Sequence, residues 1–137
     1  VRHRRRMKKI ALVMALFGSI VLSGCTTTPM PLEKATTVAA LAYSSPTDPN
    51  NSKITIIRDA GMLGAAIKAH ILVNNTLVAE LWSNEKTFIF LPDGKYFFGL
   101  KMGITRNYMN LDVKENDDIV LRISGDAFDG PSLTQSK

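Results

Sequence analysis

The stretch KTFIFLPDGKYFFGLKM, residues 86–102, decides the fold that this sequence predicts. Its two halves, Lys86–Leu91 and Tyr96–Met102, are short runs rich in aromatic and aliphatic residues, and the turn residues Pro92-Asp93-Gly94 separate them. In the second half Tyr96, Phe98 and Leu100 recur at every other position. A period of two is typical of a β-strand with one face in a core. The stretch therefore predicts two strands joined by a turn.

Five further runs of this kind surround it: Lys53–Arg58, Ala69–Asn74, Leu77–Trp82, Tyr108–Val113 and Ile119–Ile123. Ile119, Leu121 and Ile123 alternate in the last of them, and Asn74-Asn75 suits a hairpin turn with positive φ. No amphipathic segment of helix length lies between the runs, which disfavours a parallel α/β sheet. We predict an all-β fold, a single antiparallel β-sandwich of about seven strands over residues 53–125, with a small barrel as the alternative.

Without a disulfide, a domain of about seventy residues depends on its apolar core. We therefore expect its aromatic residues in that core rather than in a platform for a ligand. They are Phe88, Phe90, Tyr96, Phe97 and Phe98.

Residues 1–24 have the three parts of an export signal: a basic start, an apolar run and small residues at the end. Six of the 17 basic residues precede Ile10, and the apolar run Ile10–Leu22 follows them. As a helix these thirteen residues would extend only ~20 Å, whereas the hydrocarbon core of a membrane is about 30 Å thick. We therefore predict a cleavable signal helix rather than a permanent membrane span.

The end of this segment, Leu22-Ser23-Gly24-Cys25, resembles the lipobox of bacterial lipoproteins, and the resemblance covers the N-terminal fifth of the chain. It implies cleavage between Gly24 and Cys25 and covalent lipid on Cys25. Apart from this lipid, we expect no cofactor. Three acyl chains on one residue would make release from a membrane negligible. The alternatives are an ordinary signal peptide with an incidental cysteine, or an uncleaved anchor.

The surroundings of this site suggest where the chain begins and where it works. Met7-Lys8-Lys9 reads like a natural start, so residues 1–6 are interpreted as an extension from a misassigned start codon. In lipoproteins of this kind an aspartate directly after the cysteine favours the inner membrane, and here Thr26 occupies that position. The resemblance therefore implies the outer membrane, on its periplasmic face.

The net charge of +5 does not indicate a nucleic-acid partner. Once six basic residues leave with the signal, eleven remain against all 12 acidic ones, which gives the mature chain a net charge of −1. Binding to phosphates needs a clustered basic face, so we predict no nucleic acid. Cys25 is the only cysteine, which excludes an internal disulfide.

Residues 25–52 are rich in Thr, Pro, Ser and Asn and are typical of a flexible tether. Within them, alanines and Pro31 favour a short helix over Leu32–Tyr43. The alternatives are a spacer without structure and a segment that packs on the domain. At the other end, residues 126–137 are interpreted as a tail, and Pro131, Ser132 and its polar end suggest that it frays.

Candidate residues for chemistry are few. His70 is the only histidine after the signal, so it lacks a partner for a histidine metal site. A carboxylate-lined site built from Asp59 and Glu80 is the rival prediction of an envelope hydrolase or ligand-binding protein. The acidic residues Asp112, Glu115, Asp117 and Asp118 lack the spacing of a calcium loop and are interpreted as a solvated turn.

Three apolar residues are candidates for binding a partner. Met62 and Leu63 lie in a glycine-containing loop next to the first predicted strand. Trp82, the single tryptophan, is either a core anchor or an exposed binding residue.

The layout of the predicted domain is similar to that of small bacterial lipoproteins with an uncharacterised β-sandwich domain. The matching residues are the first run ending in Arg58, the loop with Gly61 and Gly64, the run Ile71–Val73, and the turn Leu91–Tyr96. The resemblance covers about half of the chain and implies a transthyretin-like or carboxypeptidase-regulatory-like sandwich. The function of that family is unknown, so the resemblance carries no catalytic residues over to this chain. We therefore expect a membrane-anchored, non-enzymatic interaction or structural module of the cell envelope, with an envelope protein as partner.

Overall fold

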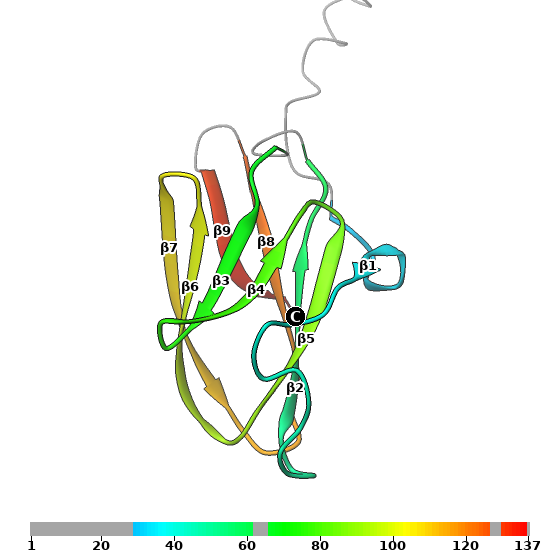
Figure 1. Cartoon of the computed structure of the whole chain (residues 1–137), viewed down its shortest axis with the longest axis vertical. Helices are drawn as coiled ribbons and strands as arrows, with labels where there is room; N and C mark the ends of the chain where they lie inside the picture. The colour runs from blue at the N-terminus through cyan, green and yellow to red at the C-terminus, as the bar shows by residue number, and fades with distance from the viewer. Residues whose placement is uncertain (1–28, 62–65, 127–129, 137) are drawn as a thin grey trace, which may run out of the picture.

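Two β-sheets packed face to face form the fold in the computed structural model, which describes residues 29–61, 66–126 and 130–136 (Figure 1). One sheet has five strands in the order β1-β5-β2-β8-β9, and the other has four in the order β4-β3-β6-β7. The strands are β1 (Thr36–Thr37), β2 (Ser52–Arg58), β3 (Ala69–Val73), β4 (Thr76–Leu81), β5 (Glu85–Leu91), β6 (Gly94–Met102), β7 (Thr105–Val113), β8 (Asp118–Asp126) and β9 (Gly130–Ser136). The predicted all-β sandwich is therefore confirmed.

The core lies between the sheets and is formed by alternating residues of nearly every strand. Phe98 and Leu100 of β6 are fully buried, and Ile119, Leu121 and Ile123 of β8 are at most 5% exposed. Tyr96 is half-buried and packs against the same cluster. The predicted alternation in both strands is confirmed, and the hairpin turn at Asn74-Asn75 has the expected positive φ angles.

The prediction that all five aromatic residues lie in the core is wrong for three of them. On β5 the residues Thr87, Ile89 and Leu91 point inward, so Phe88 and Phe90 lie half-buried on the outer face. Phe97 stands between two inward-facing neighbours on β6 and is 41% exposed. A strand can direct only every other residue into a core, and this period decides which aromatic residues are buried.

All seven predicted runs form strands, β2 to β8, and the structure adds β1 and β9. The expected frayed tail is wrong over Gly130–Ser136, because β9 pairs with β8 along its length and buries Leu133. Most pairs are antiparallel, but β2 and β8 are parallel neighbours in the middle of their sheet, and β1 pairs in parallel with β5.

The segment before β2 packs on the sandwich, which was one of the alternatives to the predicted helix. The helix is wrong: only Leu32–Lys34 forms a 3-10 turn, and β1 follows. The backbone then bonds to the edges of both sheets, with Leu41 donating to the Val78 carbonyl and Phe90 donating to the Tyr43 carbonyl. From residue 29 onward, the expected tether therefore closes the open side between β4 and β5 (Figure 1).

The two ends of the sandwich differ in what they carry. One end, which we name the Met30 end, holds Met30 and the last residues of β2, β4, β6 and β8 (top of Figure 1). The opposite end holds the connections that follow β3, β5 and β7. Within the described residues, no helix has the length and apolar character needed to span a membrane. The predicted signal peptide, residues 1–24, and Cys25 lie outside the described residues.

Candidate functional site

Hydrogen bonds from the ion pair of Asp59 and Arg122 hold the backbone of Met30. Asp59 is 5% exposed, and its Oδ1 accepts a hydrogen bond from the Met30 amide at 2.9 Å. Arg122 Nη1 donates to the same Oδ1 at 2.8 Å and to the Met30 carbonyl at 2.9 Å. Both backbone polar groups of Met30 are therefore bound to one ion pair, which we name the Met30 clamp.

The parallel pairing of β2 with β8 brings the two side chains of the clamp together. Ile57 lies beside Arg122 in this pairing, and Asp59 directly follows β2. Leu121 and Ile123 of β8 point into the core. Arg122 lies between them, so its side chain points to the outer face of the five-stranded sheet. The clamp therefore fixes Met30 on that outer face, at the end of the sandwich.

The aliphatic side chain of Ile57 is buried next to the Met30 clamp. Ile57 is fully buried although it lies on the outer face of β2, outside the main core. Its cross-strand neighbour on β5 is Lys86, and the Nζ of Lys86 donates to the Leu32 carbonyl. Because Lys86 and Arg122 flank Ile57 and both bind the N-terminal segment, that segment covers Ile57.

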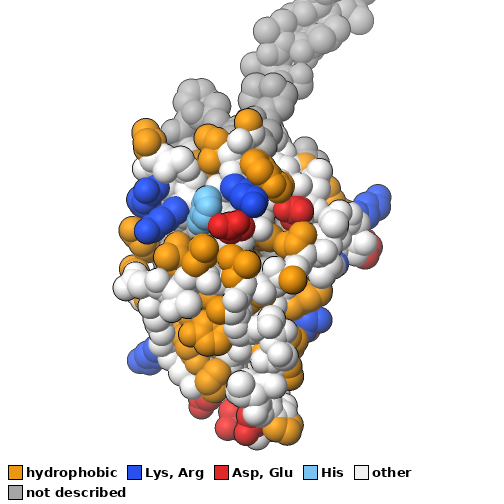
Figure 2. Space-filling model, in the orientation of Figure 1, with side chains coloured by type: hydrophobic (Ala, Val, Ile, Leu, Met, Phe, Trp, Pro, Cys, Tyr) orange, Lys and Arg blue, Asp and Glu red, His pale blue; other side chains and the backbone are white. Residues whose placement is uncertain are grey.

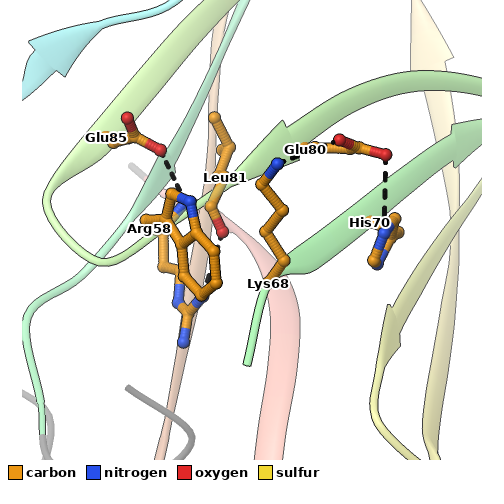
Figure 3. A network of polar contacts seen from close by, with 7 residues as sticks. Arg58, Lys68, His70, Glu80, Leu81 and Glu85 are labelled. Atoms are coloured by element: carbon orange, nitrogen blue, oxygen red, sulfur yellow. Dashed lines mark hydrogen bonds and ion pairs between the residues drawn. The ribbon is translucent and has the colours of Figure 1, made fainter. Parts of the chain in front are cut away.

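Arg58 connects the two sheets at the same end and is 3% exposed (Figure 3). Its Nη1 donates to the Leu81 carbonyl at 2.9 Å and to the Ile67 carbonyl at 2.6 Å. Burial lowers the pKa of Arg58, and the nearby carboxylate of Glu85 opposes that change. An adjoining cavity of about 20 Å³ has room for a single water molecule. Arg58 therefore acts as a structural link between the two sheets.

His70 and Glu80 face each other on β3 and β4, on the outer face of the four-stranded sheet (Figure 3). Glu80 binds Lys68 Nζ at 3.2 Å and lies 3.5 Å from His70 Nε2. Asp59, the other carboxylate of the rival hydrolase or ligand-binding prediction, lies on the outer face of the other sheet. The two carboxylates of that predicted site, Asp59 and Glu80, therefore do not share one cleft.

Three exposed apolar side chains lie at the Met30 end, and we name them the apolar cluster: Ile67, Trp82 and Ile104. Trp82 and Ile67 are each 44% exposed, and Ile104, at the turn after β6, is 99% exposed. Ile67 reaches this turn, because a Cβ added at Gly103 would lie 3.6 Å from its Cδ1. Lys68 Nζ stands 5.6 Å from the centre of the Trp82 ring.

The structure describes one of the three residues that were predicted to bind a partner. Trp82 is exposed, so its alternative as a core anchor is wrong. Met62 and Leu63 lie outside the described residues. Ile67 and Ile104 were missed, although the position of Ile104 in a two-residue turn next to Gly103 could have marked it as exposed.

Basic side chains border the apolar cluster, and we name Lys68, Lys101 and Arg106 the basic rim. Lys101 and Arg106 are cross-strand neighbours at the ends of β6 and β7. Arg106 Nη1 donates to the Gly103 carbonyl at 2.7 Å and so holds the turn that carries Ile104. The Met30 end therefore combines exposed apolar and basic groups.

Acidic side chains gather at the opposite end: Asp48, Asp93, Asp112, Glu115, Asp117 and Asp118. Figure 2 shows acidic side chains at the lower tip and apolar ones along the upper rim. Asp117 Oδ2 accepts from the Lys114 amide, and Asp112 pairs with Lys114 Nζ at 3.3 Å. Among the described residues, no group of three His, Cys, Asp or Glu is placed to hold a metal ion.

A further apolar surface lies on the outer face of the four-stranded sheet. The rings of Phe97 and Tyr108 stack with their centres 5.2 Å apart, and Tyr108 is 52% exposed. Tyr108 lies over Gly99, where an added Cβ would be 3.3 Å from its ring. Leu77 on β4 adds an exposed side chain on the same sheet. We name Leu77, Phe97 and Tyr108 the aromatic face.

A wide groove opens on the other sheet, between the N-terminal segment and β5. Its volume is about 650 Å³, and Val38, Ala40, Phe88 and Phe90 are among its lining residues. Lys53 Nζ stands 4.3 Å from the centre of the Phe88 ring. The half-buried aromatic residues of β5 therefore form the floor of this groove.

Comparison of the chain with models of protein families finds no match, and comparison with curated proteins finds none either.

Proposed function

We propose that this protein is a lipid-anchored lipoprotein of the bacterial envelope whose sandwich is a non-enzymatic interaction module. The observation that carries the proposal is the Met30 clamp. It holds the chain at one end of the domain only five residues after Cys25, the residue expected to bear lipid. Five residues extend at most about 18 Å. The anchor and the folded domain are therefore close neighbours.

The sequence before the clamp supports export and acylation. It contains a basic start, an apolar run and the residues Leu22–Cys25 in the order that lipid attachment requires. Thr26 follows the cysteine, which favours the periplasmic face of the outer membrane over the inner membrane.

Interaction with an envelope protein, rather than catalysis, is supported by two features of the sandwich. Asp59 is engaged in the Met30 clamp, on a different sheet from the His70–Glu80 pair, so these groups do not act on one substrate. The aromatic face exposes large apolar side chains, and such surfaces mark sites of protein association.

Metabolic labelling with palmitate, followed by mass analysis of the processed protein, tests the anchor. We expect label on the full chain expressed in a Gram-negative bacterium and none on the Cys25→Ser variant. A mature protein that begins at another residue, or an unlabelled one, would refute the anchor.

Photo-crosslinking in intact cells tests the interaction module. A crosslinking residue replaces Tyr108 on the aromatic face, and the matched control carries it at Thr134, which is exposed on β9 of the other sheet. We expect an envelope protein captured from position 108 and not from position 134. Equal capture from both positions, or none from either, would contradict the proposal.

A further inference from the structure

We infer that the Met30 end of the sandwich seats on the surface of the anionic membrane that holds the anchor. The apolar cluster then enters the headgroup region, and the basic rim meets anionic lipid headgroups. This inference rests on the proposed lipid at Cys25 and adds to it a fixed orientation of the domain.

The length of chain between the anchor and the clamp selects this end. Nine-residue strands such as β6 extend about 30 Å. If the opposite end faced the membrane, Met30 would stand about that distance from the surface, and the at most about 18 Å between Cys25 and Met30 could not span it. The clamp therefore keeps the Met30 end toward the membrane.

The side chains at this end suit a membrane surface. Tryptophan prefers the interface between headgroups and acyl chains, because its ring is apolar and its N–H is polar. Ile104 gains most from leaving water, since it is 99% exposed at the tip of its turn. Lys68 lies over the Trp82 ring, which places a positive charge where a lipid phosphate would stand.

The charges of the domain favour the same orientation. Each Lys or Arg near an anionic membrane gains favourable energy, whereas the acidic residues at the opposite end are repelled by it. The acidic residues Asp59, Glu80 and Glu85 lie at the Met30 end, and each has a partner. Asp59 binds Arg122, Glu80 binds Lys68, and Glu85 Oε1 accepts from the Trp82 amide at 2.6 Å.

Fluorescence of Trp82 tests the inference directly, because it is the only tryptophan in the chain. The chain from Cys25 to Lys137, which contains every described residue, is coupled through its single thiol to a maleimide-bearing lipid. The vesicles contain phosphatidylethanolamine and phosphatidylglycerol with brominated acyl chains, which quench tryptophan on contact. We expect quenching of Trp82 in these vesicles and much less in brominated phosphatidylcholine vesicles.

Two lysines on the same face of β6 provide a matched pair of variants. Lys101→Glu reverses a charge at the Met30 end, and Lys95→Glu makes the same change at the opposite end. We expect Lys101→Glu to lower the ratio of seated to unseated domain by at least about fivefold, and Lys95→Glu to leave it unchanged. Lys101→Glu would face Arg106 across the strands, whereas Lys95→Glu would face Asp112. The like-charge contact therefore arises in the control, and destabilisation of the sheet does not explain a loss of quenching confined to Lys101→Glu.

The results separate this inference from the proposed function. Unquenched Trp82 in the wild-type chain, or equal losses in the two lysine variants, would overturn the seating. An envelope protein occupying this end in place of lipid would also leave Trp82 unquenched on vesicles. Because the coupling is chemical, a chain that cells fail to acylate would refute only the proposed function.

Discussion

Removal of the Asp59 carboxylate should loosen the Met30 clamp. In the Asp59→Ala variant the Met30 amide loses its acceptor, and the Arg122 guanidinium loses its charged partner but keeps the Met30 carbonyl as an acceptor. A hydrogen bond to a charged group contributes about 1.5–3 kcal/mol, and Arg122 is exposed enough for water to replace part of what it loses. We therefore expect the free energy of unfolding to fall by about 2–3 kcal/mol.

Urea unfolding of the chain from Cys25 to Lys137 measures this loss. With a dependence of roughly 1–2 kcal/mol per molar urea for a domain of this size, the midpoint should fall by about 1–3 M. The control is Asp93→Ala, which removes an exposed carboxylate at the opposite end and should change the free energy by less than about 0.5 kcal/mol.

A double-mutant cycle with Arg122→Ala decides whether the two side chains act together. The clamp predicts a coupling free energy of about 1–2 kcal/mol, and faster hydrogen exchange at the Met30 amide in each single variant. Additive losses, together with unchanged exchange at Met30, would refute the reasoning.

Four further substitutions test the core, a close backbone contact and the docked N-terminal segment. Phe98→Ala should lower the free energy of unfolding by about 3–5 kcal/mol, whereas Phe97→Ala on the exposed face should cost about 1 kcal/mol or less; equal losses in thermal melts would contradict the assigned register. Gly125→Ala should destabilise the pairing of β8 with β9, because the new Cβ would overlap the backbone oxygen of Gly130 on the facing strand; an unchanged melting temperature would contradict this close approach. Thr87→Val removes the hydrogen bond to the Val38 carbonyl, so a loss of about 1 kcal/mol and faster proteolysis before β2 are expected, and resistance equal to that of the wild type would count against docking of the segment.

The strands that the sequence predicted share a strong local signal. β2 to β8 each contain several large apolar residues, with alternation clearest in β6 and β8, and turn residues separate them. β9 lacks this signal, because Leu133 is its only large apolar residue. Its strand conformation depends on pairing with β8. The alanines before β2 favour a helix locally, but hydrogen bonds to β5 and β4 override that preference.

The candidate site was less predictable than the fold because it depends on contacts between distant residues. Asp59 and Arg122 are 63 positions apart and meet only through the parallel pairing of β2 with β8. Short apolar runs do not reveal which strands are neighbours. Trp82 was identified as a candidate from its rarity, whereas its exposure became clear only once β4 was seen to end at Leu81.

The parallel pair in the middle of the five-stranded sheet also sets the timing of folding. It joins residues 53–58 to residues 118–123, so a chain delivered with its N-terminus first holds β2 without its central neighbour until almost the whole sequence has emerged. Pairing across such a separation is slow, typically milliseconds to seconds. During that interval the apolar residues of β2 remain exposed to any chaperone that meets them.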